Sequence, residues 1–277
     1  MQVKWLIEDF EEGNRYHVLS KEVEKQGMEC SLITYTPFQS GNYNHYNDRD
    51  CVVVQTSLQL ARQLIKDKPE WVPNAWLNLK EYECTYYYSM LGKYLFNDDY
   101  VMLPRAEVPR LIDKIYKRFG VEGNVYMRPS SGFKTFTGKV FDQNFFDKDW
   151  VWVEEFTEPQ DIVVISTPKN IVSEWRVVIA DSKPIAWSQY KDNNLSVRRK
   201  IISDDALNLA KTVASKSGYC PDPMYTMDIC KASDGRCYLL EVGSFSCAGL
   251  YMCDLEKIVQ VASKIALREY KETYNAS

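Results

Sequence analysis

Two acidic residues stand on what we predict to be the opposed strands of one β-hairpin. Residues 225–242 form two strand-like runs around an Asp-Gly dipeptide, which is typical of a two-residue hairpin turn. A turn in which Ser233 pairs with Arg236 places Asp228 directly opposite Glu241. Facing carboxylates repel each other, so the pair indicates a cation between them or a raised pKa on one of them.

Magnesium is the cation that this pair fits. Mg²⁺ prefers oxygen ligands, and it commonly takes one or two protein carboxylates and completes its shell with water and phosphate. The other face of the hairpin is predicted to pack on the core, because it carries Met227, Ile229, Leu240 and Val242. The alternative is an exposed hairpin face on which two acids bind nothing.

A loop rich in Gly, Ser and Thr, with Lys134 and Lys139 in it, follows a predicted strand within residues 126–139. Small residues let backbone N–H groups approach phosphate oxygens, and the lysines neutralise their charge. The loop is not a P-loop, because five residues separate Gly132 from Gly138 and no Ser or Thr follows the second lysine. An ordinary hairpin loop with solvated lysines is the alternative.

Two further segments carry charges on predicted strands. The strand predicted over 150–156 ends in paired acids and an aromatic residue, and its backbone is a candidate to face an adenine edge. Glu174 and Arg176 lie two apart on a strand and therefore share a face, and the arginine suits bidentate contact with phosphate or carboxylate. A surface ion pair is the alternative for these two residues.

The loop 243–251 follows the strand that carries Glu241. It is our candidate for binding the acceptor or carboxylate substrate, through Ser244, Ser246 and Tyr251. The alternative is a simple connection between a strand and the next helix.

The elements that position these residues predict an α+β fold. The first eighty residues alternate strand and helix patterns, which predicts a small α/β lobe with a parallel sheet. An amphipathic helix over 104–120 comes next, followed by a meander of short strands and by helices at 203–217 and 254–270. The strands of the meander are predicted at 125–128, 136–141, 150–156, 162–166, 171–180 and 185–190.

Composition excludes several classes of protein. The 277 residues are 45% hydrophobic, with 38 acidic against 34 basic side chains, which indicates a folded chain without the basic surface of a dedicated nucleic-acid binder. The eight cysteines show no C-x-x-C spacing, which argues against a zinc site, and their apolar neighbours suit reduced thiols in the cytoplasm. No apolar run reaches the length of a membrane span, and no signal peptide is recognised.

In this order the motifs resemble the ATP-grasp superfamily, including a phage-associated branch of little-characterised members proposed to act in RNA repair or in ligation. The likeness spans roughly residues 100 to 255. Arg128-Pro129 stands where many relatives have Lys-Pro, and residues 154–156 resemble the hinge strand beside adenine. Many relatives have an Asn two residues after the metal-binding Glu, whereas this chain has Gly243, which leaves the number of metal ions open.

The resemblance implies ATP and Mg²⁺ as cofactors, with Asp228 and Glu241 as metal ligands and Arg176 and Lys134 as the residues that stabilise developing charge. It implies an α/β lobe over 1–80 and an ATP-grasp domain over 81–277, with a nucleotide lid at about 104–156 and a metal-binding part at about 157–277. The implied nucleotide-binding residues are Arg128, Ser131, Gly132, Lys134, Thr135, Lys139, Glu154, Glu155, Phe156, Glu174 and Arg176.

The implied reaction joins a carboxylate to an amine or a similar nucleophile through an acyl phosphate, with release of ADP and phosphate. A nucleic-acid repair ligase that uses the same ATP site is the first alternative, although the near-neutral charge argues mildly against it. A nucleotide-binding module without catalysis is the second. The partners we expect are therefore ATP and a carboxylate–amine substrate pair, with no membrane.

Overall fold

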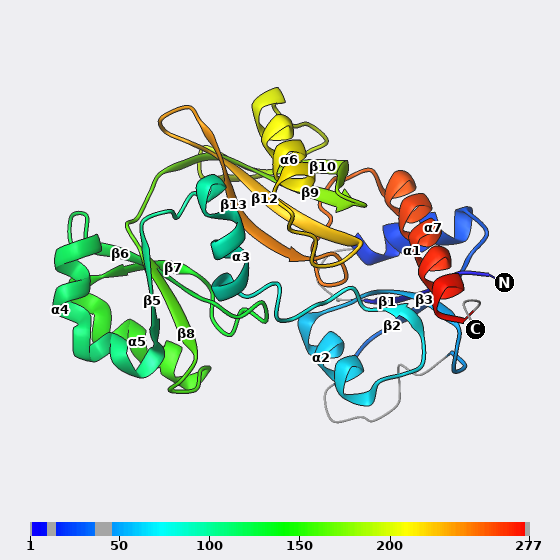
Figure 1. Ribbon diagram of the computed structural model, residues 1–277, viewed down its shortest axis with the longest axis horizontal. Helices are drawn as coiled ribbons and strands as arrows, with labels where there is room; N and C mark the ends of the chain where they lie inside the picture. Colours follow the sequence, from blue (N-terminus) through cyan, green and yellow to red (C-terminus); the bar gives the residue numbers. More distant parts are fainter. Residues whose placement is uncertain (1, 10–14, 37–45, 275–277) are drawn as a thin grey trace.

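Within the described residues, three β-sheets with flanking helices make up the fold (Figure 1). The computed structural model describes residues 2–9, 15–36 and 46–274. In Figure 1 the sheet at one end is built from the first strands of the chain, the sheet at the other end carries α4 and α5, and the third sheet lies between them. The predicted α+β fold class is confirmed.

The N-terminal sheet is parallel, in the strand order β2-β1-β3-β4. Successive side chains of β1 point to opposite faces, so Trp5 and Ile7 pack with α1 and α7, while Leu6 packs with α2. The last helix of the chain therefore returns to cover the first strands, as Figure 1 shows. The bounds are β1 Lys4–Glu8, α1 Arg15–Lys25, β2 Glu29–Ile33, β3 Cys51–Gln55, α2 Leu58–Asp67, β4 Val72–Asn74 and α7 Leu255–Tyr274. This confirms the predicted α/β lobe.

The N-terminus of α2 is held by two polar contacts. The Ser57 hydroxyl accepts a hydrogen bond from the Leu60 amide at 3.1 Å, which is the capping role that this residue type favours. The buried Glu8 carboxylate accepts from the Ser57 amide at 2.7 Å.

No helix within the described parts of the chain has the length and apolar character needed to cross a membrane.

The second sheet is antiparallel, in the order β5-β8-β6-β7, and packs against α4 and α5 around one apolar cluster. Strand β8 belongs to this sheet although it lies beyond residue 156, where we predicted the lid to end, so the sheet extends past that boundary. The bounds are β5 Tyr100–Pro104, η2 Arg105–Glu107, α4 Val108–Phe119, β6 Asn124–Pro129, β7 Lys139–Asp142, η3 Gln143–Phe145, α5 Phe146–Glu155 and β8 Ile162–Ser166.

The prediction of a strand over 150–156 is wrong, because residues 150–155 continue helix α5 and Phe156 is its C-cap. The alternation of Trp and Val suggested a period of two, but the buried positions are Phe146, Trp150 and Val153, spaced by four and three. Trp152 is 62% exposed, so the aromatic residue that completed the alternation lies outside the core.

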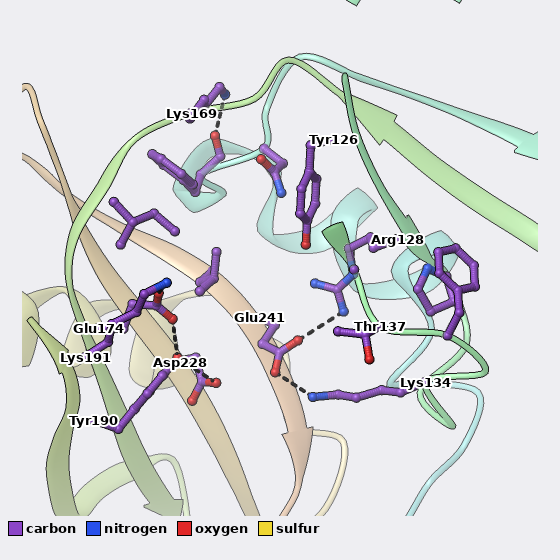
Figure 2. Close-up of a pocket in the computed structure, with 17 residues that line it drawn as sticks. Tyr126, Arg128, Lys134, Thr137, Lys169, Glu174, Tyr190, Lys191, Asp228 and Glu241 are labelled. Carbon is purple, nitrogen blue, oxygen red and sulfur yellow. Dashed lines mark hydrogen bonds and ion pairs between the residues drawn. The ribbon is translucent and has the colours of Figure 1, made fainter. Parts of the chain in front are cut away.

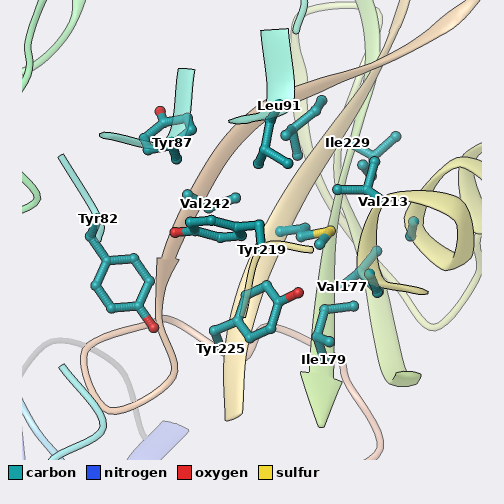
Figure 3. Close-up of a cluster of buried hydrophobic side chains, with 14 of the residues drawn as sticks. Tyr82, Tyr87, Leu91, Val177, Ile179, Val213, Tyr219, Tyr225, Ile229 and Val242 are labelled. Carbon is teal, nitrogen blue, oxygen red and sulfur yellow. The ribbon is translucent and has the colours of Figure 1, made fainter. Parts of the chain in front are cut away.

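The third sheet is antiparallel, in the order β11-β10-β9-β12-β13. One of its faces buries Val177, Ile179, Met227, Ile229 and Val242 against α3 and α6 in an aromatic-rich core (Figure 3). The opposite face is the one that carries the charged residues discussed below. The bounds are α3 Cys84–Leu91, η1 Gly92–Tyr94, β9 Ile171–Ala180, β10 Lys183–Asp192, β11 Leu195–Arg199, α6 Asp204–Lys216, β12 Met224–Ala232 and β13 Cys237–Ser244.

The hairpin between β12 and β13 has the predicted pairing of its two acids but a different turn and a bulge. Asp228 does lie opposite Glu241, as predicted. The two-residue turn is wrong, because the Ala232 amide donates to the Arg236 carbonyl at 3.0 Å and leaves a three-residue loop. A β-bulge at Leu240 then shifts the register by one and restores the Asp228–Glu241 pair. Leu239, rather than the predicted Leu240, therefore faces the core.

We predict that Asp222→Asn stabilises the protein at neutral pH and above. The Asp222 carboxylate accepts from the Tyr82 hydroxyl at 2.7 Å and from the Asn78 amide at 3.2 Å, and burial raises its pKa to about 7 despite these bonds. The folded state therefore binds more protons than the unfolded state between about pH 4 and pH 7, and stability falls as the pH rises through this window. Above it, the variant should be more stable than the wild type by about 1–2 kcal/mol.

Urea unfolding at about pH 5 and pH 8 measures this difference. The asparagine oxygen can still accept from Tyr82, so lost hydrogen bonding does not mask the effect of the charge. A stability difference between variant and wild type that is the same at both pH values would contradict the raised pKa.

Candidate functional site

Four charged side chains share the face of the third sheet that is turned away from its core. Arg176 on β9 pairs with Asp228 on β12, and Asp228 pairs with Glu241 on β13, so the three residues are neighbours across three strands. Glu174 lies two residues before Arg176 on the same face. The predictions that Glu174 and Arg176 share a face and that Asp228 and Glu241 are opposed are confirmed.

All three acids of this group, Glu174, Asp228 and Glu241, are paired with cations, and Glu174 pairs with Lys191 at 2.9 Å. The pairs of Glu241 are drawn in Figure 2. Arg176 binds Asp228 in a bidentate ion pair, with 2.9 Å between Nη2 and Oδ2. Glu241 accepts from the Lys134 ammonium at 2.8 Å and from the Arg128 guanidinium at 3.1 Å. Arg128 lies on β6 and Lys134 in the loop after it, so two cations of the second sheet reach across to an acid of the third.

These pairings set the protonation of the acids. Burial disfavours the charge on Glu241, but the nearby Lys134 and Arg128 outweigh it and lower its pKa to about 2. For Asp228, burial raises the pKa, Arg176 opposes the shift, and the Glu241 carboxylate adds to it. Glu241 is therefore ionised throughout the physiological range, and the charge on Asp228 depends on Arg176.

Two bulged residues, Tyr190 and Leu240, point into the same region, and sequence reasoning missed the role of both. The register of β10 slips after Tyr190 and that of β13 slips at Leu240, so that Tyr190 and Lys191, and likewise Leu240 and Glu241, are consecutive residues that both line the first cavity. The Tyr190 hydroxyl donates to Glu174 Oε2 at 2.6 Å and lies 3.3 Å from Asp228 Oδ2 (Figure 2). The strand pattern could indicate which residues alternate, but not where a bulge interrupts the alternation.

Two adjoining cavities meet at the two acids Asp228 and Glu241. The first has a volume of about 360 Å³ and lies between the second and third sheets, and the second, of about 260 Å³, opens toward the N-terminal lobe. Both are lined by the same four charged residues, which are Arg128, Lys134, Asp228 and Glu241. A ligand in one cavity can therefore meet a ligand in the other at these side chains.

The two cavities differ away from this junction. The far part of the first is apolar, because Phe96, Ile171 and Leu240 line it and pack in one cluster. The second is lined by Arg176 on one side and by Leu58, the first residue of α2, on another. No pattern in the sequence indicated Phe96, which comes from the segment between η1 and β5.

The loop after β6 reaches the site only in part. Ser131, Gly132 and Lys134 line the second cavity, whereas Thr135 lines neither. Gly132 is required for packing, because a Cβ at this position would lie 2.9 Å from the Cβ of Tyr82. Lys139 is directed elsewhere, since its ammonium pairs with Asp149 of α5 at 2.9 Å.

The residues predicted to border adenine are not at either cavity. Glu154 and Glu155 end helix α5, and Glu154 pairs with Arg105 at 3.0 Å. Phe156 is 57% exposed. None of the three lines the first or the second cavity, and the strand that would have placed them beside a base does not form.

Of the three residues predicted to bind the acceptor or carboxylate substrate, two line the second cavity and one does not. The Ser246 hydroxyl accepts from the Trp76 amide at 2.9 Å, and the Ser244 hydroxyl donates to the Trp76 carbonyl at 2.6 Å. These serines therefore fasten the loop 243–251 to the segment after β4. Tyr251 and Ser244 line the second cavity, while the fully buried Ser246 does not.

A divalent cation fits the acidic pair by the chemistry of its oxygen donors. Asp228 and Glu241 are opposed on neighbouring strands and offer carboxylate oxygens of the kind that Mg²⁺ prefers. In the part of the chain that the structure describes, no three or more His, Cys, Asp or Glu side chains gather to hold a metal by themselves. Any Mg²⁺ at this pair would thus complete its shell from phosphate and water.

Comparison with known proteins decides the family. The profile of an ATP-grasp domain, the third family of its clade, matches residues 102–261, which contain both acids and all three of their cationic partners. The chain belongs to this ATP-grasp family. No curated protein matches it in sequence. The resemblance to the superfamily is thereby confirmed, while an association with phage stays a prediction.

Solved structures show the same fold over nearly the whole ATP-grasp chain. D-cycloserine synthetase DcsG superposes with a TM-score of 0.67 at 10% identity, covering 95% of this chain and 99% of that chain. D-alanine–D-alanine ligase from Bacillus anthracis gives 0.57 at 14% identity, covering 99% of both chains. ATP-grasp ligase PsnB complexed with minimal precursor gives 0.57 at 11% identity, covering 96% of this chain and 100% of that chain. Because these sequence identities are low, the structural likeness shows a shared fold and no more.

We predict that Arg176→Met destabilises the fold by about 3 kcal/mol at neutral pH, because it leaves Asp228 buried without its partner. Adding Asp228→Asn should recover part of that loss, since no buried charge then remains. Urea unfolding of both single variants and of the double variant measures the coupling.

The matched control is Arg236→Met, which breaks the exposed ion pair between Arg236 and Asp234 and should lower stability far less than Arg176→Met does. Equal destabilisation by Arg176→Met and Arg236→Met would show that the buried pair has no special weight.

Proposed function

We propose that this ATP-grasp protein is an ATP- and Mg²⁺-dependent ligase that joins a carboxylate to an amine or a similar nucleophile through an acyl phosphate. The observation that carries the proposal is the junction of the two cavities, where Arg128, Lys134, Asp228 and Glu241 line both. A nucleotide in one cavity would place its terminal phosphate beside a carboxylate held in the other. The three ligases and synthetases of the same fold support this class of reaction.

The first cavity suits the nucleotide. Its apolar part, lined by Phe96, Ile171 and Leu240, is the proposed seat of the adenine. Its charged part offers Arg128 and Lys134 to the phosphates. We propose this placement of the base instead of contact with residues 154–156, which lie outside the cavity.

Asp228 and Glu241 are the residues that would hold Mg²⁺. When bound there, Mg²⁺ would neutralise phosphate charge, which the protein's cations alone do only in part. The remaining work falls to side chains of this chain: Lys134 and Arg128 bind phosphate, and Arg176, which lines the second cavity, binds and orients the carboxylate.

The proposed chemistry has two displacements. A carboxylate oxygen attacks the γ-phosphorus, and the bond from that phosphorus to the oxygen of the leaving ADP breaks. The amine then attacks the acyl carbon, and phosphate leaves from it as the amine loses a proton. Positioning and charge stabilisation account for both steps, so no side chain has to form a covalent bond.

The decisive experiment is product analysis. ADP and phosphate should appear only when ATP, Mg²⁺, a carboxylate and an amine are supplied together. AMP and pyrophosphate with a lysine adduct would favour a nucleotidyl-transferring nucleic-acid ligase instead, and nucleotide binding without turnover of any carboxylate–amine pair would favour a module without catalysis.

We predict that Asp228→Asn and Glu241→Gln each lower Mg²⁺-dependent turnover by about 100-fold or more, because each removes one of two proposed protein ligands of the cation. Glu272→Gln makes the same chemical change on the exposed surface of α7 and should have no effect. Calorimetric titration with Mg²⁺ and ATP measures whether the loss arises at binding. Wild-type turnover by either site variant would sink the proposed metal site.

We predict different effects for the two lysines near the loop after β6. Lys134→Met should weaken ATP binding by about tenfold, because its ammonium lies at the junction of both cavities. Lys139→Met should leave binding unchanged, because that lysine pairs with Asp149 on α5. Calorimetry with ATP separates the two. A larger effect from Lys139→Met would restore its predicted place in the nucleotide site.

A further inference from the structure

Arg176 contacts Asp228, which lines both cavities, and also two residues of the loop that lines the second cavity. Its Nε and Nη2 donate to the two oxygens of Asp228, one of the proposed magnesium ligands. Its Nη1 donates to the Gly249 carbonyl at 3.0 Å, and its guanidinium lies 5.4 Å from the centre of the Tyr251 ring. Gly249 and Tyr251 belong to the loop that lines the second cavity. One cation therefore joins the acid of the nucleotide site to the loop of the carboxylate site.

Tyr251 is held in an unfavourable backbone conformation by contacts on both sides. Its φ is +48°, which residues other than glycine rarely adopt. Its ring stacks on Tyr190, with centroids 4.8 Å apart and planes inclined by 9°. Tyr190 is in turn fixed by its hydroxyl, which donates to Glu174 in the first cavity. The two tyrosines thus form a continuous contact from the first cavity to the second.

The rest of the loop is attached to firm neighbours. The Ala248 carbonyl accepts from the Gln55 side chain at 2.7 Å, and the Met252 amide donates to the Ser188 hydroxyl at 3.2 Å. The segment from Gly249 to Tyr251 lies between these two anchors. Its contacts with Arg176 and Tyr190 are therefore the ones able to change while the loop stays in place.

Mg²⁺ bound at Asp228 would share that carboxylate with Arg176. An arginine keeps its charge at any physiological pH, so the bound cation would repel the guanidinium and favour its movement off Asp228. Its contacts with Gly249 and Tyr251 lie on the side of the second cavity and do not involve Asp228. The freed guanidinium has these two groups to hold it there.

We propose that Tyr251 is a positioning residue that holds Arg176 at the second cavity once Mg²⁺–nucleotide has taken Asp228, so that nucleotide and carboxylate bind cooperatively. The inference rests on the proposed function, which assigns the two cavities. By linkage the coupling is reciprocal: a carboxylate that engages Arg176 in the second cavity draws it from Asp228 and strengthens Mg²⁺–nucleotide binding.

The test uses the non-hydrolysable analogue AMPPNP with the purified 277-residue protein. Tyr251→Leu removes the ring that receives Arg176, so the guanidinium stays on Asp228 and the Kd for Mg²⁺–AMPPNP should rise by about tenfold. The Kd for AMPPNP in the presence of EDTA should not change. Tyr251→Phe keeps the ring and its stacking and should bind as the wild type does. Tyr251→Met fills similar space without an aromatic face and should repeat the loss seen with leucine.

Tyr100→Leu is the matched control. It removes a ring that lies 4.8 Å from Tyr88, the same centroid distance as in the Tyr190–Tyr251 stack, and it lines neither cavity. This variant should leave the Kd unchanged. Thermal unfolding of every variant shows which ones fold as the wild type does, and the methionine variant serves if the leucine variant does not.

Acetate is the minimal carboxylate probe of the coupling. It should lower the Kd for Mg²⁺–AMPPNP by about threefold in the wild type and in Tyr251→Phe, but not in Tyr251→Leu, relative to chloride at the same ionic strength. The inference is overturned if Tyr251→Leu and Tyr251→Phe bind alike, or if acetate has no effect on the wild type. If the wild type binds AMPPNP no better with Mg²⁺ than with EDTA, the proposed function itself fails, and this inference fails with it.

Discussion

The opposition of Asp228 and Glu241 is the constraint that the rest of the site satisfies. Two carboxylates on neighbouring strands, mostly withdrawn from water, repel each other and lose hydration, and both costs are large in a medium of low dielectric. Three cations offset them, one from the same sheet and two from another. The charged side chains of the site thus lie where they do chiefly because these two acids are there.

The sheet itself could not be regular and still carry this arrangement. With the observed three-residue loop, a β13 without its bulge would have paired Asp228 with Leu240 and turned Glu241 toward the core. Each bulge adds one residue, so that two consecutive side chains border the first cavity, Tyr190 and Lys191 on β10 and Leu240 and Glu241 on β13. The apolar alternation on the other face survives beyond each bulge, so the core under the sheet is retained.

Most of the fold could be predicted from the sequence, because the periodicity of apolar residues within each helix or strand is a local signal. The parallel lobe, helix α4 and strands β8 and β9 follow from periodicity, and Asp228 lies opposite Glu241 as predicted. Two errors arose where tertiary packing decides. A Trp-Val alternation suggested a strand at 150–156, but Phe146 and Trp150 pack at helical spacing against the second sheet. The Asp-Gly dipeptide suggested a two-residue turn, and an unpredicted bulge compensated for the longer one.

Residues that reach the site from distant segments left no pattern to find. Phe96 enters from the segment before β5, and Leu58 from the start of α2, and each is placed only by the way separate sheets pack. Conversely, Lys139 looked equivalent to Lys134, yet Asp149 on the adjoining helix takes its charge. Spacing along the chain indicates which side chains share a strand face, but it does not indicate which partner on another element claims a long, flexible lysine.

On the proposed function, the balance of charge at the junction is a reason for cation and nucleotide to bind there together. A polyphosphate alone would be attracted by Arg128 and Lys134 but would face two buried acids, and a divalent cation alone would be attracted by the acids but would face three positive side chains. If the two arrived together, the cation would bind the acids, and the phosphates would bind the lysine and arginine that the acids release. Because those two cations belong to the second sheet and the acids to the third, the same exchange replaces direct ion pairs between the sheets by contacts through the bound pair.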